Sequence, residues 1–152
     1  MNRPRVILAD DHRLLREAFA ALLEPWCEVV GTVSDGSELL ASAAALKPDV
    51  VVLEISLPRL NGLDAGRRLK LLMPQVKLIY LTAIEDPETV TEAFRAGASG
   101  FLLKNSAGSE LLQAIREVTA GRGRITETSS AKRVRETNET METMETMKRW
   151  NH

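Results

Sequence analysis

Short runs of apolar, often β-branched residues alternate five times with longer segments of helical periodicity. The apolar runs are 6–9, 29–33, 50–53, 78–81 and 100–103. This alternation is typical of parallel βαβ units, in which each strand is followed by a helix that packs back on the sheet. The run 50–53 is apolar throughout, which predicts a strand that is covered on both faces. The sequence therefore predicts a doubly wound α/β fold.

Capping residues and prolines predict where the helices begin and end. The first helix is expected to end before Pro25 and to bury one apolar stripe. That stripe consists of Leu14, Leu15, Ala18, Phe19, Leu22 and Leu23. Asp86 is expected to cap the fourth helix, with Pro87 in its first turn. The last helix is predicted to begin with Ser109 as its N-cap and to end at Gly121.

The segment 124–152 differs in kind from the rest of the chain. It contains few aliphatic residues, and Glu-Thr-Met repeats three times over 139–147. A period of three does not match the 3.6 residues of a helical turn, so the methionines form no stripe. We therefore expect one domain over 1–123, followed by a disordered or weakly helical tail in preference to a partner-binding helix. The basic cluster 132–135 is expected to be solvated.

The composition of the chain is that of a globular protein and gives no sign of a membrane or nucleic-acid partner. The chain of 152 residues is 44% hydrophobic and 27% charged, which is ordinary for a globular protein with a core. A formal net charge of −1 gives no support for a membrane or nucleic-acid surface. No apolar run reaches the roughly 18 residues of a membrane span, and the single Cys27 cannot form an internal disulfide. We expect a cytoplasmic protein that binds neither a membrane nor nucleic acid directly.

Polar side chains stand at the ends of four of the apolar runs. Asp10 and Asp11 follow the first run, Glu54 closes the third, Thr82 closes the fourth and Lys104 follows the fifth. Ligands of open α/β sheets bind beyond the carboxyl ends of the strands, so these side chains are expected to converge. Their chemistry suits a phosphorylated carboxylate beside a divalent cation, because carboxylates bind the cation and the ammonium binds a phosphoryl oxygen.

The carboxylates predict a magnesium site. Asp10, Asp11 and Glu54 supply hard oxygen ligands, and the backbone carbonyl of Ser56 is expected to add another, with waters completing an octahedron. His12 follows the acidic pair, but we expect it to be a surface residue at the start of a helix. Positive charge from the cation would offset the charge of a transferring phosphoryl group.

Four stretches resemble the receiver domains of response regulators, most closely those of NarL/LuxR-type transcriptional regulators. They are ADDHRLLREAFAALL at 9–23, VVVLEISLPRLNG at 50–62, YLTA at 80–83 and AGASGFLLK at 96–104. The resemblance covers residues 4 to about 123 and implies a flavodoxin-like (βα)5 fold with strand order 2-1-3-4-5. It also implies a two-component signalling function in place of an enzymatic one.

The resemblance assigns a role to each site residue. It makes position 54 the phosphoacceptor position and assigns Thr82, Ala83 and Lys104 to phosphoryl binding. It makes Phe101 the aromatic residue that relays the state of the site together with Thr82. The implied partners are a sensor histidine kinase or another regulator. A homodimer is expected through either the face of the fourth helix, fifth strand and fifth helix, or the face of the first and fifth helices.

The chain departs from the family pattern in three places. Glu54 stands where the family has the phosphoacceptor Asp, and Phe101 lacks a hydroxyl. In addition, no DNA-binding helix-turn-helix is expected in 124–152, although NarL-type regulators carry one. The longer side chain of Glu54 carries its carboxylate about 1.3–1.5 Å further into the pocket.

Three hypotheses about Glu54 stay open from the sequence. The receiver is insensitive to phosphorylation and its state is set by Glu54, or it still responds through Mg²⁺ or weak Glu phosphorylation as part of a DNA-binding regulator. Alternatively, the domain is a degenerate docking module or a deliberate variant. We favour the first, since a degenerate site has no physical need for Asp10, Asp11, Thr82 and Lys104.

One class of enzyme and one cofactor-binding fold share features with this sequence. A haloacid-dehalogenase-type phosphatase also combines Asp, Thr and Lys with Mg²⁺, but its two aspartates are separated by one residue, whereas Asp10 and Asp11 are adjacent. A dinucleotide-binding domain would need G-x-G-x-x-G after the first strand, and none is present there. Both alternatives are therefore weaker than the receiver.

Overall fold

The computed structural model describes residues 3–84 and 86–121 and contains one parallel sheet of five strands. The strands are β1 (Arg5–Ala9), β2 (Glu28–Val33), β3 (Val50–Glu54), β4 (Lys77–Thr82) and β5 (Gly100–Leu103). Their order in the sheet is β2-β1-β3-β4-β5, and every neighbouring pair is parallel. The predicted doubly wound fold and the strand order 2-1-3-4-5 are confirmed.

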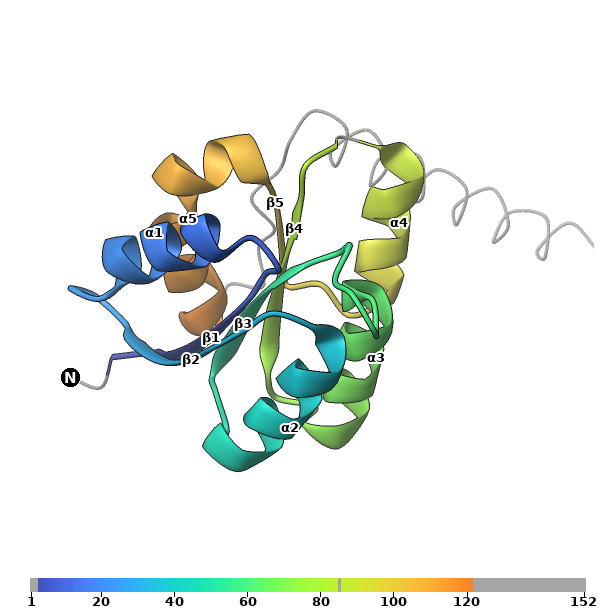
Figure 1. Cartoon of the computed structure of the whole chain (residues 1–152), viewed down its shortest axis with the longest axis horizontal. Coiled ribbons are helices and arrows are strands. Elements are labelled where there is room, and N and C mark those ends of the chain that lie inside the picture. Colours follow the sequence, from blue (N-terminus) through green and yellow to red (C-terminus); the bar gives the residue numbers. More distant parts are fainter. Residues whose placement is uncertain (1–2, 85, 122–152) are drawn as a thin grey trace, which may run out of the picture.

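Helices cover both faces of this sheet. They are α1 (Arg13–Leu23), α2 (Gly36–Leu46), α3 (Gly62–Leu72), α4 (Pro87–Arg95) and α5 (Lys104–Thr119). Figure 1 shows α1 and α5 on one face, with α2, α3 and α4 on the other. Parallel strands need such crossover helices, and crossovers are right-handed. The chain steps from β1 to β2 in one direction and from β2 on to β3, β4 and β5 in the other, so α1 and the later crossover helices lie on opposite faces.

The hydrophobic core is divided by the sheet into two clusters. On the side of α1 and α5, buried residues include Val6, Leu8, Phe19, Leu111 and Ile115. The cluster on the other side includes Ile7, Leu39, Leu69, Tyr80 and Phe101. All five residues of β3 are buried, as its unbroken apolar run predicts.

Side-chain caps fix the starts of three helices. The carboxylate of Asp35 accepts from the backbone amide of Glu38, that of Asp86 accepts from Glu88, and the amide oxygen of Asn61 accepts from Asp64. These bonds satisfy amides that have no partner within the first helical turn. The predicted cap at Asp86 is confirmed.

The predicted start of α5 is wrong. The helix begins at Lys104, directly after β5, and no side chain caps it. Ser109 lies inside the helix, where its hydroxyl donates to the backbone carbonyl of Ser106. The sequence 104–108 has weak helical propensity, so it gives no signal for a helix that begins at Lys104. The predicted end is confirmed, because Gly121 adopts φ +73° just beyond the last turn.

The predicted apolar stripe of α1 is too wide. Phe19 and Leu23 are buried, but Leu14 is 81% exposed and Leu22 is 39% exposed. Ala18 is exposed as well. These three residues are spaced four apart and lie on the outer side of the helix, because α1 packs on the sheet along one narrow line.

Part of the predictions falls outside the described residues. The tail 124–152 lies there, so its predicted conformation stays a prediction. Within the described ranges, no helix combines the length and apolar character that crossing a membrane requires.

Candidate functional site

The register of the parallel strands brings the predicted site residues to one edge of the sheet. Ala9 pairs with Leu53, Glu54 pairs with Leu81, and Thr82 pairs with Leu103. Each of these strands therefore ends at the same level, and Asp10 and Lys104 follow immediately. Asp10, Glu54 and Thr82 are the buried polar or charged residues among those that the structure describes.

Lys104 lies between two buried carboxylates. Its Nζ is 2.9 Å from Oδ2 of Asp10 and 3.0 Å from Oε2 of Glu54. The three side chains are 3–10% exposed, so these ion pairs are shielded from solvent. Both carboxylate oxygens are buried, and the ammonium of Lys104 is the partner of each. The ammonium therefore holds two negative charges that would otherwise be uncompensated.

The ion pairs also change the proton affinity of Lys104. Burial by itself lowers the pKa of this ammonium, but the contacts with Asp10 and Glu54 outweigh burial and hold the pKa above its ordinary value. Lys104 is therefore a fixed positive charge at neutral pH, as the recognition of a phosphoryl oxygen requires.

The two oxygens of Glu54 have different surroundings. Oε2 faces Lys104, whereas Oε1 accepts from the backbone amide of Ser56 at 3.2 Å. Asp11 is half-exposed at the rim, with its side chain 43% accessible. The site thus has a buried floor made by Asp10 and Glu54 and an open rim at Asp11.

His12 lies closer to the acidic pair than expected. Its side chain is 63% exposed, in agreement with a surface position, yet Nδ1 lies 3.0 Å from Oδ1 of Asp10 and 3.3 Å from Oδ1 of Asp11. The same nitrogen is 3.0 Å from Nζ of Lys104. Its position directly after the acidic pair was the only sequence signal for these contacts.

The residues that the resemblance assigns to phosphoryl binding and to the relay have contacts of their own. Thr82 shares two long hydrogen bonds with the backbone of Ile84, at 3.3 and 3.4 Å, and Ala83 is exposed beside it. Phe101 is fully buried and pairs with Tyr80 across β4 and β5. The hydroxyl of Tyr80 donates to the carbonyl of Ala96, which follows α4.

The loop between β3 and α3 packs closely against the site. A Cβ on Gly62 would lie 2.1 Å from the backbone oxygen of Glu54, and one on Gly36 would lie 1.8 Å from that of Leu60. Arg59 adopts φ +67° in the same loop, and its Nε is 3.8 Å from Asp35 while its side chain stays 77% exposed. Arg59 is therefore a largely solvated charge in this loop.

The donor set fits a hard divalent cation. Asp10 and Glu54 supply buried carboxylates that share the ammonium of Lys104, and Asp11 adds a carboxylate at the open rim. Carboxylate oxygens are the ligands that Mg²⁺ prefers. These three residues are therefore the ones that would hold such an ion.

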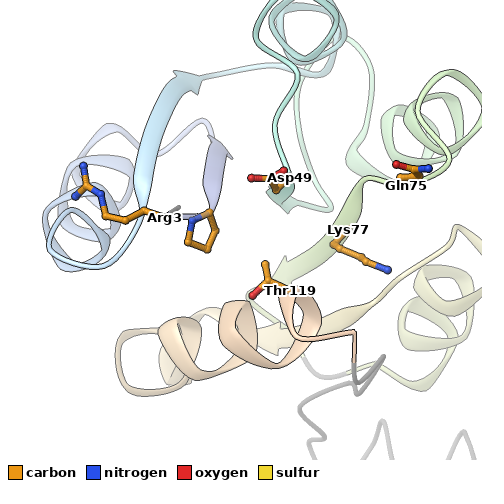
Figure 2. Close-up of a pocket in the computed structure, with 6 residues that line it drawn as sticks. Arg3, Asp49, Gln75, Lys77 and Thr119 are labelled. Atoms are coloured by element: carbon orange, nitrogen blue, oxygen red, sulfur yellow. The ribbon is translucent and has the colours of Figure 1, made fainter. Parts of the chain in front are cut away.

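A hollow at the opposite edge of the sheet has a different character. It has a volume of about 520 Å³ and is lined by Arg3, Pro4, Asp49, Gln75, Lys77 and Thr119. Figure 2 shows the Arg3 and Lys77 side chains pointing away from one another, and Arg3 donates to the carbonyl of Glu24. The cationic ends do not converge, so the acidic cluster is the stronger candidate site.

Comparison with known proteins identifies the family. A family model described as the response regulator receiver domain matches residues 6–116. An uncharacterized transcriptional regulatory protein of Bacillus subtilis, YxjL, is 36% identical over 90% of this chain and 63% of its own length. The DNA-binding transcriptional activator DevR/DosR of Mycobacterium tuberculosis is 36% identical over 84% and 59%. The chain thus spans about 59–63% of the length of these relatives.

A solved structure of a response regulator also resembles this chain. A two-component response regulator of the LuxR family from Aurantimonas sp. SI85-9A1 has a TM-score of 0.82 and 32% identity, covering 90% of this chain and 99% of that one. The family consists of receiver domains and not of enzymes, as the sequence predicts. The chain belongs to the response regulator receiver family of two-component signalling proteins, close to the NarL/LuxR-type transcriptional regulators.

Proposed function

We propose that Glu54 occupies the phosphoacceptor position of this receiver and that Glu54, in place of phosphorylation, sets its signalling state. The observation that carries the proposal is the 3.0 Å contact between Oε2 of Glu54 and Nζ of Lys104. The family uses this lysine to bind a phosphoryl oxygen. In this chain the carboxylate of Glu54 already contacts that lysine, where a phosphoryl oxygen would otherwise bind.

Two physical arguments support a site impaired in phosphoryl transfer. The extra methylene displaces the nucleophilic oxygen by more than about 1 Å, and such a displacement costs about a hundredfold in rate. The carboxylate also brings about one negative charge to Lys104, against the nearly two of a phosphoryl group. Glu54 therefore imitates the charge of the phosphorylated state only in part.

Mg²⁺ is the proposed cofactor. Asp10, Asp11 and Glu54 would hold it, together with the backbone carbonyl of Ser56. The bound ion would offset negative charge in the pocket. Asp10 and Glu54 would contribute buried carboxylates to the ion, and Asp11 would contribute one that is exposed to solvent.

The proposed relay runs from Thr82 and Ala83 to Phe101. Thr82 bonds weakly to the backbone of Ile84, so its hydroxyl is available for rearrangement. Phe101 is packed in the cluster that includes Val90 and Ala93 of α4. A movement of the β4–α4 loop would thus reach the face formed by α4, β5 and α5.

The output proposed for the domain is association with other proteins. A sensor histidine kinase or another regulator is the expected signalling partner, in the cytoplasm. Of the two candidate homodimer faces, exposed apolar side chains favour that of α1 and α5. Leu14, Leu22 and Trp26 are exposed there, and the guanidinium of Arg116 in α5 lies 5.0 Å from the centre of the Trp26 ring.

A role in transcription follows from the relatives. DevR/DosR is named a DNA-binding transcriptional activator, and this chain matches about 59% of it. We assign residues 1–123 to the receiver and treat 124–152 as a separate tail. The proposed receiver would control transcription through a DNA-binding domain, and would not contact DNA itself.

Acetyl phosphate tests the proposal. Wild type and Glu54→Asp are incubated with acetyl phosphate and Mg²⁺, and phosphorylation is followed by intact-mass spectrometry. We expect the Asp variant to gain one phosphoryl group and wild type to react at least about a hundredfold more slowly. Stoichiometric phosphorylation of wild type at the rate of the Asp variant overturns the proposal.

A further inference from the structure

An apolar groove lies between α2 and α3, apart from the acidic cluster. It has a volume of about 400 Å³ and is lined by Leu40, Ala44, Lys47, Leu69, Leu72 and Met73. Apart from Lys47, these side chains are apolar, and Leu72 is 69% exposed although it lines the groove. Apolar surface that gathers in one exposed place marks an interaction site.

The rim of this groove is cationic. Lys47 is the C-cap of α2, adopts φ +49° and is exposed. Arg68 is exposed as well and precedes Leu72 by one turn, so the two residues lie on the same face of α3. The occupant that complements the groove is therefore a segment that carries apolar side chains together with carboxylates.

The segment 136–147 of this chain has that chemistry. It lies outside the described residues, and its sequence ETNETMETMETM contains four glutamates, three methionines and no basic residue. Methionine is unbranched and flexible, so it fits irregular apolar surfaces. An extended backbone with three residues per turn would place Met141, Met144 and Met147 on one side, about 9 Å apart, which suits a groove.

The end of α5 lies near the groove. Helices between parallel strands run antiparallel to them, so α2, α3 and α5 all end at the edge of the sheet where the strands begin. Figure 2 shows Thr119, in the last turn of α5, on the same hollow as Asp49 and Gln75. Each of these two residues lies two positions beyond a residue of the groove. The chain over 121–136 can extend about 50 Å, at about 3.3 Å a residue, so the acidic segment reaches the groove.

We propose that residues 136–147 dock in the groove between α2 and α3 of the same molecule. The methionines contact the apolar lining, and the glutamates lie beside Lys47 and Arg68. Because the segment belongs to the same chain, its effective concentration at the groove is about millimolar, so a contact of modest affinity suffices. The docked segment covers the α2–α3 face, and a partner that binds this face must displace it.

Paramagnetic relaxation in the full chain tests the docking. A nitroxide is attached to Thr143→Cys in a Cys27→Ala background, and methyl spectra are recorded with the nitroxide oxidised and reduced. We expect the oxidised label to broaden the methyl signals of Leu40 and Met73 in the groove. The methyl signals of Leu14, on α1 at the other face of the sheet, should stay sharp.

Two variants of the groove sharpen the test. Leu72→Gln should weaken docking by about tenfold or more, because it removes the burial of one leucine side chain. Leu71→Gln is the matched control, since Leu71 is exposed but does not line the groove, and it should keep the broadening. If Leu72→Gln folds poorly, the spectra of the chain without it decide.

Three results overturn the proposal. They are equal broadening of groove and α1 signals, unchanged broadening in Leu72→Gln, and equal broadening when the nitroxide and the isotope label are on different molecules. The last result would assign the contact to a second copy of the chain. All three are measured without phosphorylation, so they leave the Glu54 account untouched.

Discussion

At the scale of single residues, the ammonium of Lys104 has the largest structural consequence. It is the nearest positive charge to two buried carboxylates, those of Asp10 and Glu54, at 2.9 and 3.0 Å. Removing one partner of a buried ion pair leaves an uncompensated charge in a region of low polarity, and that cost exceeds the net value of the pair.

Lys104→Met is expected to lower the free energy of unfolding by about 3–5 kcal/mol in the presence of a chelator. The two carboxylates would then repel one another without a cation between them. Urea unfolding measures the change. Lys77→Met, at the opposite edge of the sheet, is the control, and a loss as small as that of this control would contradict the role given to Lys104.

The pKa of Lys104 predicts an alkaline limit of stability. Burial lowers this pKa, but the ion pairs with Asp10 and Glu54 outweigh it, so the folded-state pKa lies above the ordinary 10.5. A raised lysine pKa gives stability that is present below 10.5 and is lost as pH rises through the folded-state value.

We therefore expect the unfolding free energy of wild type to fall more steeply above about pH 10.5 than that of Lys104→Met. Burial also raises the pKa of Tyr80, which adds an alkaline loss to both proteins. Comparing the two proteins in a Tyr80→Phe background isolates the contribution of Lys104. Parallel pH curves would show that the lysine is not stabilised in the folded state.

The sequence predicted which polar residues lie at the ends of the strands, but not the contacts that they make. Asp10, Glu54, Thr82 and Lys104 could be found because a strand end is a one-dimensional feature. The 3.0 Å approach of His12 to Asp10 depends on a ring orientation that no sequence pattern reports. Likewise, the bonding of Thr82 to Ile84 depends on the path of the β4–α4 loop.

At the scale of elements, the start of α3 determines where the β3–α3 loop can lie. The amide of Gly62 donates to the carbonyl of Ile55, and its Cα approaches the carbonyl of Glu54 so closely that a methyl group would overlap it. The backbone that carries Glu54 is therefore held by a helix terminus.

Gly62→Ala is expected to destabilise the protein by about 2–3 kcal/mol, since the added Cβ must displace backbone at β3. Gly108→Ala is the matched control, because its Cβ would enter open space within α5. That change should stabilise the protein by about 0.5–1 kcal/mol. Similar effects of both substitutions in thermal unfolding would contradict the close approach at Gly62.

The ends of helices could be predicted where a side chain caps the helix or fixes a backbone angle. Asp86 and Pro87 specify the start of α4 through local bonding and a fixed φ. No side chain caps the start of α5 at Lys104, so the first capping residue in the sequence, Ser109, does not mark the start of the helix. Packing decided which leucines of α1 are buried.

At the scale of the whole molecule, strand order is a long-range property. The periodicity of the sequence predicts strands and helices but does not say which strands are neighbours. The order 2-1-3-4-5 followed from the family resemblance, and the pairing of β1 with both β2 and β3 confirms it. This order places α1 and α5 on the same face, where they form one surface.

That surface predicts how the molecule associates. Leu14→Glu is expected to weaken a homodimer by at least about tenfold, because it replaces the most exposed apolar side chain of α1 with a charge. Leu71→Glu is the matched control, since Leu71 is 83% exposed on α3, on the other face. Sedimentation equilibrium measures both. Equal dimerisation of wild type and Leu14→Glu would contradict a dimer through α1 and α5 and would favour the α4-β5-α5 face.

The most direct test of the account is sedimentation velocity of wild type and Glu54→Asp with Mg²⁺, each with and without beryllofluoride, which imitates a phosphoryl group. We predict that only the Asp variant changes on adding beryllofluoride, and that it then reaches the association state that wild type shows without it. A beryllofluoride response of wild type equal to that of Glu54→Asp would contradict the claim that Glu54 sets the state of the receiver.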